Sequence, residues 1–293
     1  MKQYTIPKKL AIINDISGFG RCSFTVALPV VSALKVQGCP VPTSIFSNHM
    51  AFPTYYMDDY TEKLPDYLNV WSELQLSFDG IYSGYLGSVE QIKIVEDFII
   101  QQKILWNKKH TSDSTFVSSN VFQIIIDPVM GDHGKSYKSI TPELCNEMKS
   151  LVKQATIITP NITEACLLTD SVYKESWSEE ELCLIANKLH SLGPTKVVIT
   201  GIHNDQYFVN FISENTSTPY TVSVSTPIAG ESRPGTGDIF ASIVAAKALK
   251  GEDFKASVES AATFISTCTK ASSDLCIPVV EGVCFENFLH LLG

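Results

Sequence analysis

One stretch of the chain combines a flexible backbone with a carboxylate: Arg233-Pro-Gly-Thr-Gly-Asp238, followed at once by an apolar run with helical spacing. Gly235 and Gly237 have no Cβ, so the backbone there lets a ligand approach closely. If a helix begins here, its free N–H groups and the positive end of its dipole form a site for an anion. Beside such a site, Asp238 can accept a proton while a phosphoryl group is transferred. Acids also favour the first turn of a helix for structural reasons alone, and the sequence leaves that alternative open.

Two other stretches place carboxylates and amides at short spacing. Asp127-Pro-Val-Met-Gly-Asp132 directly follows an apolar run at 122–126, and Thr159-Pro-Asn-Ile-Thr-Glu164 places Asn161 three residues before Glu164. Oxygen ligands of this kind suit Mg²⁺, which usually keeps several waters when it binds. The Asn161–Glu164 spacing is also that of a helix start, with a capping residue and an acid three positions later. The two interpretations are compatible with each other.

The hydrophobic pattern predicts the elements that position these residues. Short apolar runs alternate with longer segments of helical spacing, which is typical of a mostly parallel sheet with helices on both faces. We expect strands at 10–13, 41–46, 80–86, 122–126, 155–161, 196–201, 207–212 and 220–224, the last two as an antiparallel hairpin. We expect helices at 24–34, 89–106, 141–153, 178–191, 238–250, 254–270 and 281–292, and a polar surface loop at 111–120. The fold class is α/β in three layers, and residues 1–293 are expected to form one domain, since no linker divides them.

Ligands of such sheets bind beyond the carboxyl ends of the strands. Polar residues that fall at or just after predicted strand ends are Asp15, Asn48, His49, Tyr85, Asp127, Asp132, Thr159, Asn161 and Thr200. Their position at one edge of the sheet predicts a ligand site there, although polar residues end strands in many proteins.

The composition excludes several classes of protein. With 293 residues, 44% of them hydrophobic and 18% charged, the chain has the make-up of an ordinary globular protein. A net charge of −9 and the lack of Lys or Arg runs argue against nucleic acid or a membrane surface as a partner. The amino terminus has no signal-peptide core, and no apolar run is long enough to span a bilayer. Eight scattered cysteines without a C-x-x-C motif indicate reduced thiols, so we expect a cytoplasmic protein.

Two phosphate-binding motifs of other folds are incomplete here. Residues 17–23 resemble a dinucleotide fingerprint, but Ser23 replaces its third glycine and no acid follows before Asp58 to hold a ribose. Gly134-Lys-Ser136 would end a P-loop, but the glycine required five residues earlier is Val129. We therefore reject an NAD-binding Rossmann site and a P-loop NTPase.

The motif Gly235-Thr-Gly-Asp238 resembles the signature of the ribokinase-like superfamily. Other motifs match the vitamin B6 kinase branch of that superfamily in the same order along residues 10–270: Phe46-Ser-Asn-His49, Tyr85, Asp127-Pro-Val-Met-Gly-Asp132 with Gly134 and Tyr137, Asn161-Ile-Thr-Glu164 and Val197-Val-Ile-Thr200. The resemblance implies a ribokinase-like three-layer α/β/α fold and a small-molecule kinase that uses ATP.

The resemblance also implies a role for each motif. Asp238 is expected to be the catalytic base, and Gly235, Thr236 and Gly237 to form the anion hole. The residues expected to bind the nucleotide are Asp127, Asp132, Tyr137, Thr159, Thr200, Gly201 and Thr236. Those expected to bind the substrate are Asp15, Ser47, His49, Met50, Tyr85 and Asp238. Asn161 and Glu164 are expected to arrange Mg²⁺, directly or through water, and the resemblance allows a monovalent cation such as K⁺ near Asp127.

The implied reaction is phosphorylation of the 5′-hydroxymethyl group of pyridoxal, pyridoxine or pyridoxamine, by a protein that is usually a homodimer. Three departures from the family leave details open. Asp15 stands where vitamin B6 kinases usually have Ser, Met50 where they often have Thr, and Gly201 where Ser is common. A hydroxymethylpyrimidine kinase is one alternative, and a non-catalytic protein that binds nucleotide or a B6 vitamer is another. The intact Asp238 argues against the second, because binding alone needs no base.

Overall fold

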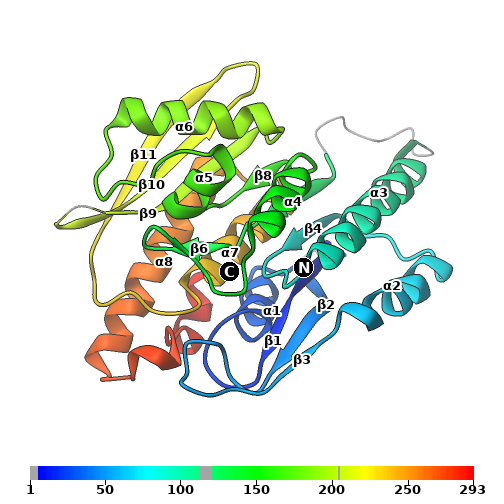
Figure 1. Ribbon diagram of the computed structural model, residues 1–293, viewed down its shortest axis with the longest axis horizontal. Helices are drawn as coiled ribbons and strands as arrows, with labels where there is room; N and C mark the ends of the chain where they lie inside the picture. Colours follow the sequence, from blue (N-terminus) through cyan, green and yellow to red (C-terminus); the bar gives the residue numbers. More distant parts are fainter. Residues whose placement is uncertain (1–5, 112–120, 204) are drawn as a thin grey trace, which may run out of the picture.

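The computed structural model describes residues 6–111, 121–203 and 205–293. A nine-stranded sheet forms its centre, in the order β11-β10-β9-β8-β5-β4-β1-β2-β3 (Figure 1). The strands are β1 (Lys9–Ser17), β2 (Gln37–Phe46), β3 (Met57–Asp59), β4 (Gly80–Ser83), β5 (Gln123–Ile126), β8 (Ile157–Ile158), β9 (Lys196–His203), β10 (Tyr207–Glu214) and β11 (Tyr220–Pro227). The stretch from β9 to β2 is parallel throughout, and β3, β10 and β11 pair antiparallel. The predicted sheet and its terminal hairpin are confirmed.

Helices cover both faces of this sheet, which makes three layers (Figure 1). One face carries α1 (Phe24–Ala33), α7 (Thr236–Leu249) and α8 (Phe254–Asp274). The other carries α2 (Leu64–Glu73), α3 (Val89–Thr111), α4 (Pro142–Val152), α5 (Ile162–Thr169) and α6 (Glu179–Leu192). A separate two-stranded sheet, β6 (Gly131–Asp132) with β7 (Lys135–Ser136), follows β5.

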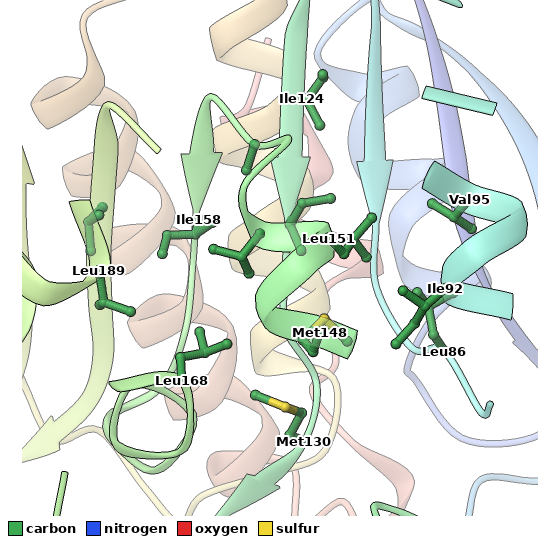
Figure 2. Packing of buried hydrophobic residues seen from close by; sticks show 14 of the residues in the cluster. Leu86, Ile92, Val95, Ile124, Met130, Met148, Leu151, Ile158, Leu168 and Leu189 are labelled. Carbon is green, nitrogen blue, oxygen red and sulfur yellow. The ribbon is translucent and has the colours of Figure 1, made fainter. Parts of the chain in front are cut away.

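The central strands are apolar on both sides because each side faces a helical layer. Adjacent residues alternate between the two cores: Ile12 packs with α1 and α7, whereas Ile13 packs on the opposite face. Figure 2 shows the second of these cores, to which Ile124 of β5, Ile158 of β8 and Leu151 of α4 all belong. Full burial of each such side chain contributes about 1.5–3 kcal/mol, which fixes the strands in one register.

Several boundaries differ from the sequence prediction. Residues 281–292 do not form an α-helix; two short 3₁₀ segments, η2 (Val279–Glu281) and η3 (Glu286–Leu291), stand there, because Gly282 between them has a φ of 83°. β4 and β8 are shorter than predicted, α7 starts two residues earlier, and α2 and β3 had no counterpart in the prediction. Of the predicted loop at 111–120, Thr111 ends α3 and the rest lies outside the described residues.

Within the three described ranges, no helix combines the length and the apolar character needed to cross a membrane. The eight cysteines, all of which lie in those ranges, form no disulfide.

Candidate active site

The start of α7 has the geometry of an anion site. Gly235 is the residue before the helix, with a φ of 83°, and a Cβ built there would lie 1.9 Å from the carbonyl oxygen of Arg21. Only glycine fits this position without moving the backbone. The first N–H groups of α7 have no partner within the helix, so they are available to a bound anion. Thr236 opens the helix, and its hydroxyl donates to the Arg233 carbonyl at 3.2 Å.

Asp238, in the first turn of α7, is held by two donors from the other end of the chain. Its Oδ1 accepts from Asn14 Nδ2 at 3.1 Å, and its Oδ2 accepts from the Ser23 backbone N–H at 2.8 Å. Burial, together with the negative charge of Asp15, raises the pKa of Asp238 from 3.8 to about 6, although both hydrogen bonds act in the opposite direction. A carboxylate with a pKa close to neutral is well suited to accept a proton at physiological pH.

Asn14 connects three segments at this site. Its side chain is 1% exposed, and its Oδ1 accepts the backbone N–H groups of Asp15 and Tyr85, each at 3.0 Å. It thereby joins the end of β1, the segment after β4 and the start of α7. Neither Asn14 nor Ser23 was predicted to have a functional role. The position of Asn14 beside Asp15 at a strand end was a usable signal, whereas nothing in the sequence indicated the contact of Ser23 with Asp238, 215 residues away.

Asp15 lies within β1 and is 6% exposed. Its two carboxylate oxygens accept from the hydroxyl groups of Ser23 at 2.6 Å and Ser17 at 3.1 Å. Burial raises its pKa above the usual range, despite these hydrogen bonds. Arg21 does not neutralise it, because the Arg21 guanidinium pairs with Glu286 at 2.6 Å.

Asp127, at the end of β5, is a second buried carboxylate near α7. Its Oδ1 accepts from the Thr159 hydroxyl at 2.9 Å. Its Oδ2 faces the start of α7, since a Cβ built on Gly237 would lie 3.9 Å from it. Burial and the nearby charge of Asp238 raise the pKa of Asp127. A cation bound here would lower the free-energy cost of keeping the Asp127 carboxylate ionised, and the role of Asp127 toward a cation stays a prediction.

Asn161 and Glu164 form a capping box at the start of α5. Asn161 Oδ1 accepts the Glu164 N–H at 3.0 Å, and Glu164 accepts the backbone N–H groups of Asn161 at 2.8 Å and Met130 at 3.0 Å. Burial and the charge of Asp127 raise the pKa of Glu164. The structural interpretation of this motif is confirmed, and its role toward Mg²⁺ remains a prediction. In the described part of the chain, no three His, Cys, Asp or Glu side chains gather closely enough to hold a metal ion.

The other residues predicted to bind nucleotide lie around α5. Thr200 forms an isolated parallel bridge with Asn161, and Gly201 follows it with a φ of 70°. Asp132 ends β6, and Tyr137 follows β7 with 41% of its surface exposed. The β6–β7 turn is fixed to α5, because the Gly134 N–H donates to the Thr163 hydroxyl at 2.9 Å.

The residues predicted to bind substrate differ in their exposure and in the contacts of their side chains. Tyr85 is buried, with its ring centroid 6.4 Å from that of Phe46. Met50 is 41% exposed. His49 has a backbone contact at each ring nitrogen, Nε2 with the Val280 carbonyl at 2.8 Å and Nδ1 with the Ala51 N–H at 3.3 Å. Ser47 is similarly engaged, since its hydroxyl accepts the Tyr56 N–H at 2.9 Å and donates to Asn48 at 2.7 Å. His49 and Ser47 therefore shape the segment between β2 and β3.

A cavity of about 520 Å³ lies elsewhere, between α6 and the β10–β11 hairpin. Its lining includes His190, Glu214 and Tyr220. Glu214 pairs with Lys196, the first residue of β9, so the cavity is at the edge where the parallel strands begin. Asp127 and Thr159 lie at the opposite edge, and the cavity is not part of their site.

Fold and site together define a class. A three-layer sandwich with an anion site and a carboxylate at one helix start is the arrangement of the ribokinase-like kinases. The family model described as phosphomethylpyrimidine kinase matches residues 28–277, and the chain belongs to this family.

Solved structures and curated relatives agree on the family and differ in substrate. A Bacteroides thetaiotaomicron protein assigned as a phosphomethylpyrimidine kinase is 33% identical, with a TM-score of 0.89 over 100% of this chain and 96% of that one. A second crystal form of that protein, with pyridoxal, has a TM-score of 0.84. The hydroxymethylpyrimidine/phosphomethylpyrimidine kinase of Aquifex aeolicus is 31% identical over 64% of this chain and 74% of its own length.

A pyridoxal kinase from Leishmania donovani, in complex with ADP and pyridoxamine, has a TM-score of 0.87 over 97% of this chain and 95% of that one. At 19% identity, this likeness shows the fold alone. Pyridoxal and pyridoxine kinases match at 32% and 30% identity. The chain spans only 48% and 59% of the length of these last two relatives.

Proposed function

We propose that this protein transfers the γ-phosphoryl group of ATP to the 5′-hydroxymethyl group of pyridoxal, pyridoxine or pyridoxamine. The observation that carries the proposal is Asp238, a partly buried carboxylate with a pKa of about 6, held by Asn14 and Ser23 beside the open N–H groups of α7. A protein that only bound these ligands would not need a base of this kind. The pyridoxal-containing Bacteroides structure, 33% identical over 98% of this chain, supports the choice of substrate.

In this proposal Asp238 accepts the proton of the substrate hydroxyl, and that oxygen forms a bond to the γ-phosphorus. The bond from this phosphorus to the β–γ bridging oxygen breaks, and ADP leaves. The N–H groups of residues 235–237 stabilise the negative charge of the phosphoryl group, because positioning and electrostatics dominate such transfers. Tyr85 and Met50 contact the substrate ring. Thr159, Thr200, Gly201, Asp132 and Tyr137 line the nucleotide side.

Mg²⁺ would be held near Asp127, Asn161 and Glu164 and would neutralise phosphate charge when bound. The donor set fits, because Mg²⁺ commonly binds through one or two carboxylates, waters and the substrate phosphates. Each Glu164 oxygen already accepts a backbone N–H, which favours a contact through water. We also propose a monovalent cation at Asp127 and a homodimer, as the family resemblance implies, and a cytoplasmic location, as the scattered cysteines without a C-x-x-C motif suggest.

A second candidate function is phosphorylation of hydroxymethylpyrimidine, the same reaction on another heteroaromatic alcohol. The matching family model and the Aquifex relative favour it. The exposed Met50, at a substrate-side position, is compatible with either ring.

The test is ATP turnover with each of the three B6 vitamers and with hydroxymethylpyrimidine, and with Asp238→Asn as the control for contaminating kinases. The proposal expects a kcat/KM at least tenfold higher for one B6 vitamer than for hydroxymethylpyrimidine. The reverse ranking would replace it with the second candidate. Tight vitamer binding by calorimetry without turnover would show a binding protein instead.

A further inference from the structure

Ser23 has a backbone conformation that is rare for a residue with a side chain. Its φ is 53° and its ψ is −132°, in a region that glycine enters freely and other residues avoid. It precedes α1, but its hydroxyl makes no capping bond to that helix. Such strain persists only where surrounding contacts impose it, and it is often found at functional sites.

Two contacts of Ser23 explain why the chain keeps this conformation. Its hydroxyl donates to Asp15 Oδ1 at 2.6 Å, and its backbone N–H donates to Asp238 Oδ2 at 2.8 Å. Ser23 is 6% exposed, and the Asp15 carboxylate is fixed on its other side by the Ser17 hydroxyl at 3.1 Å. A hydrogen bond to a carboxylate is stronger than one between neutral groups, so the contact with Asp15 stabilises the residue whose N–H reaches Asp238.

We propose that Asp15 is a positioning residue, which holds Ser23 in the strained conformation that presents its N–H to Asp238. This inference rests on the proposed function, because it assigns to Asp238 the role of base. It gives Asp15 a different task from the contact with substrate that its place in the sequence predicts. Both carboxylate oxygens already accept a hydroxyl, which satisfies the buried charge without a ligand.

If Asp15 acts through Ser23, a second substitution at Ser23 should restore the kcat that is lost when Asp15 is replaced. In Asp15→Ala the Ser23 hydroxyl loses its acceptor, and the backbone can relax away from Asp238. Strain of this kind corresponds to a loss of roughly ten- to a hundred-fold in kcat. Glycine adopts the same φ and ψ without strain and keeps the N–H that Asp238 accepts, so Ser23→Gly alone should lose less kcat than Asp15→Ala. The double variant Asp15→Ala/Ser23→Gly should then recover most of the kcat that Asp15→Ala loses.

A conservative variant separates positioning from recognition of a cationic substrate. Asp15→Asn keeps one oxygen for the Ser23 hydroxyl but removes the charge. If Asp15 is a positioning residue, kcat should change by the same factor on every vitamer at pH 8, where Asp238 is ionised with or without the Asp15 charge, and the KM for ATP should be unchanged. Ser178→Gly is the matched control, because Ser178 precedes α6 with an ordinary φ of −79° and caps Glu181. It should lower Tm only slightly, because glycine is tolerated at the N-cap, and it should leave kcat unchanged.

Two results would overturn the proposal. One is a double variant no more active than Asp15→Ala. The other is an Asp15→Asn enzyme whose kcat/KM ratio between pyridoxamine and pyridoxine shifts tenfold or more, which would make Asp15 a substrate ligand. If the wild-type protein phosphorylated none of the alcohols, the proposed function would fail, and hydrogen exchange of the Ser23 amide would decide the rest. If the Ser23 amide exchanges slowly in the wild type and in Asp15→Asn but rapidly in Asp15→Ala, Asp15 positions Ser23. Rapid exchange of this amide in the wild type would refute the proposal.

Discussion

Replacement of Asp238 by Asn, combined with a change of pH, tests the proposed base directly. Burial and the charge of Asp15 raise the pKa of Asp238 from 3.8 to about 6. A general base acts only in its ionised form, so wild-type kcat/KM should fall below pH 6. With a single titrating group the fall is about tenfold per pH unit, which leaves roughly a tenth of the plateau at pH 5.

Asp238→Asn should lower kcat by roughly 10²–10⁴-fold, the usual contribution of a positioned general base. This corresponds to about 3–5 kcal/mol of transition-state free energy. Asn has the same shape and can still accept the Ser23 N–H, but its NH₂ group then faces Asn14 Nδ2, which is also a donor. The binding of ATP and of vitamer should change little, because the Asn side chain can still hydrogen-bond the substrate hydroxyl.

The same substitution should have an opposite, pH-dependent effect on stability. The folded-state pKa is raised, so folding favours the protonated carboxyl. That contribution is fully present below the unfolded pKa near 3.8 and is lost as pH rises through about 6. The difference in Tm between Asp238→Asn and the wild type should therefore be more positive at pH 8 than at pH 4.

The assay measures ADP release between pH 5 and 8 at saturating Mg²⁺, with vitamer binding followed by calorimetry. An Asp238→Asn enzyme that keeps near wild-type kcat would show that Asp238 is only an acid at a helix start. If the residual rate of Asp238→Asn falls at acidic pH in the same way as the wild-type rate, another group causes the fall, and Asp127 is one candidate.

Three further predictions concern the surrounding structure. Glu164→Gln should raise the Mg²⁺ concentration needed for half-maximal rate and leave vitamer affinity without ATP unchanged; an unaltered Mg²⁺ titration would restrict Glu164 to its capping role. Gly235→Ala should abolish most activity and lower Tm, because the added Cβ would lie 1.9 Å from the Arg21 carbonyl oxygen. Steady-state kcat and thermal melting measure the two effects. If neither changed, the backbone at the start of α7 would have to differ from the one described here. Leu151→Ala should lower the free energy of unfolding, measured in urea, by about 2–5 kcal/mol, because the side chain is fully buried in the core of Figure 2. The KM for ATP should stay constant. A loss of unfolding free energy below about 1 kcal/mol would contradict this packing.

Local pattern was sufficient for most of the fold. The strand at Leu10–Ile13 is apolar on both faces because helical layers cover both sides, and this double burial was visible as an unbroken apolar run. Alternation of such runs with helical segments predicted a parallel sheet, and a parallel sheet brings the carboxyl ends of its strands to one edge. Asp127, Thr159 and Asn161 lie at that edge, as the sequence predicted.

Local pattern failed where distant segments determine the conformation. The 3₁₀ segments around Gly282 contact the β1–α1 loop, since Arg21 and Gly282 form an isolated bridge, and no sequence window contains both. The contact of His49 Nε2 with the Val280 carbonyl, 231 residues away, could not be predicted from local pattern either, and the role of His49 toward substrate stays a prediction.

At Asp238, too, some features follow from the sequence alone and others depend on the tertiary structure. The sequence alone determined its residue type, its flanking glycines and its place at a helix start. Its pKa and orientation depend on Asn14, Ser23 and Asp15, more than 200 residues earlier in the chain. Hydrogen bonds and desolvation act over a few ångströms in space, so only the packing of β1 and α1 against α7 decides which groups surround the carboxylate.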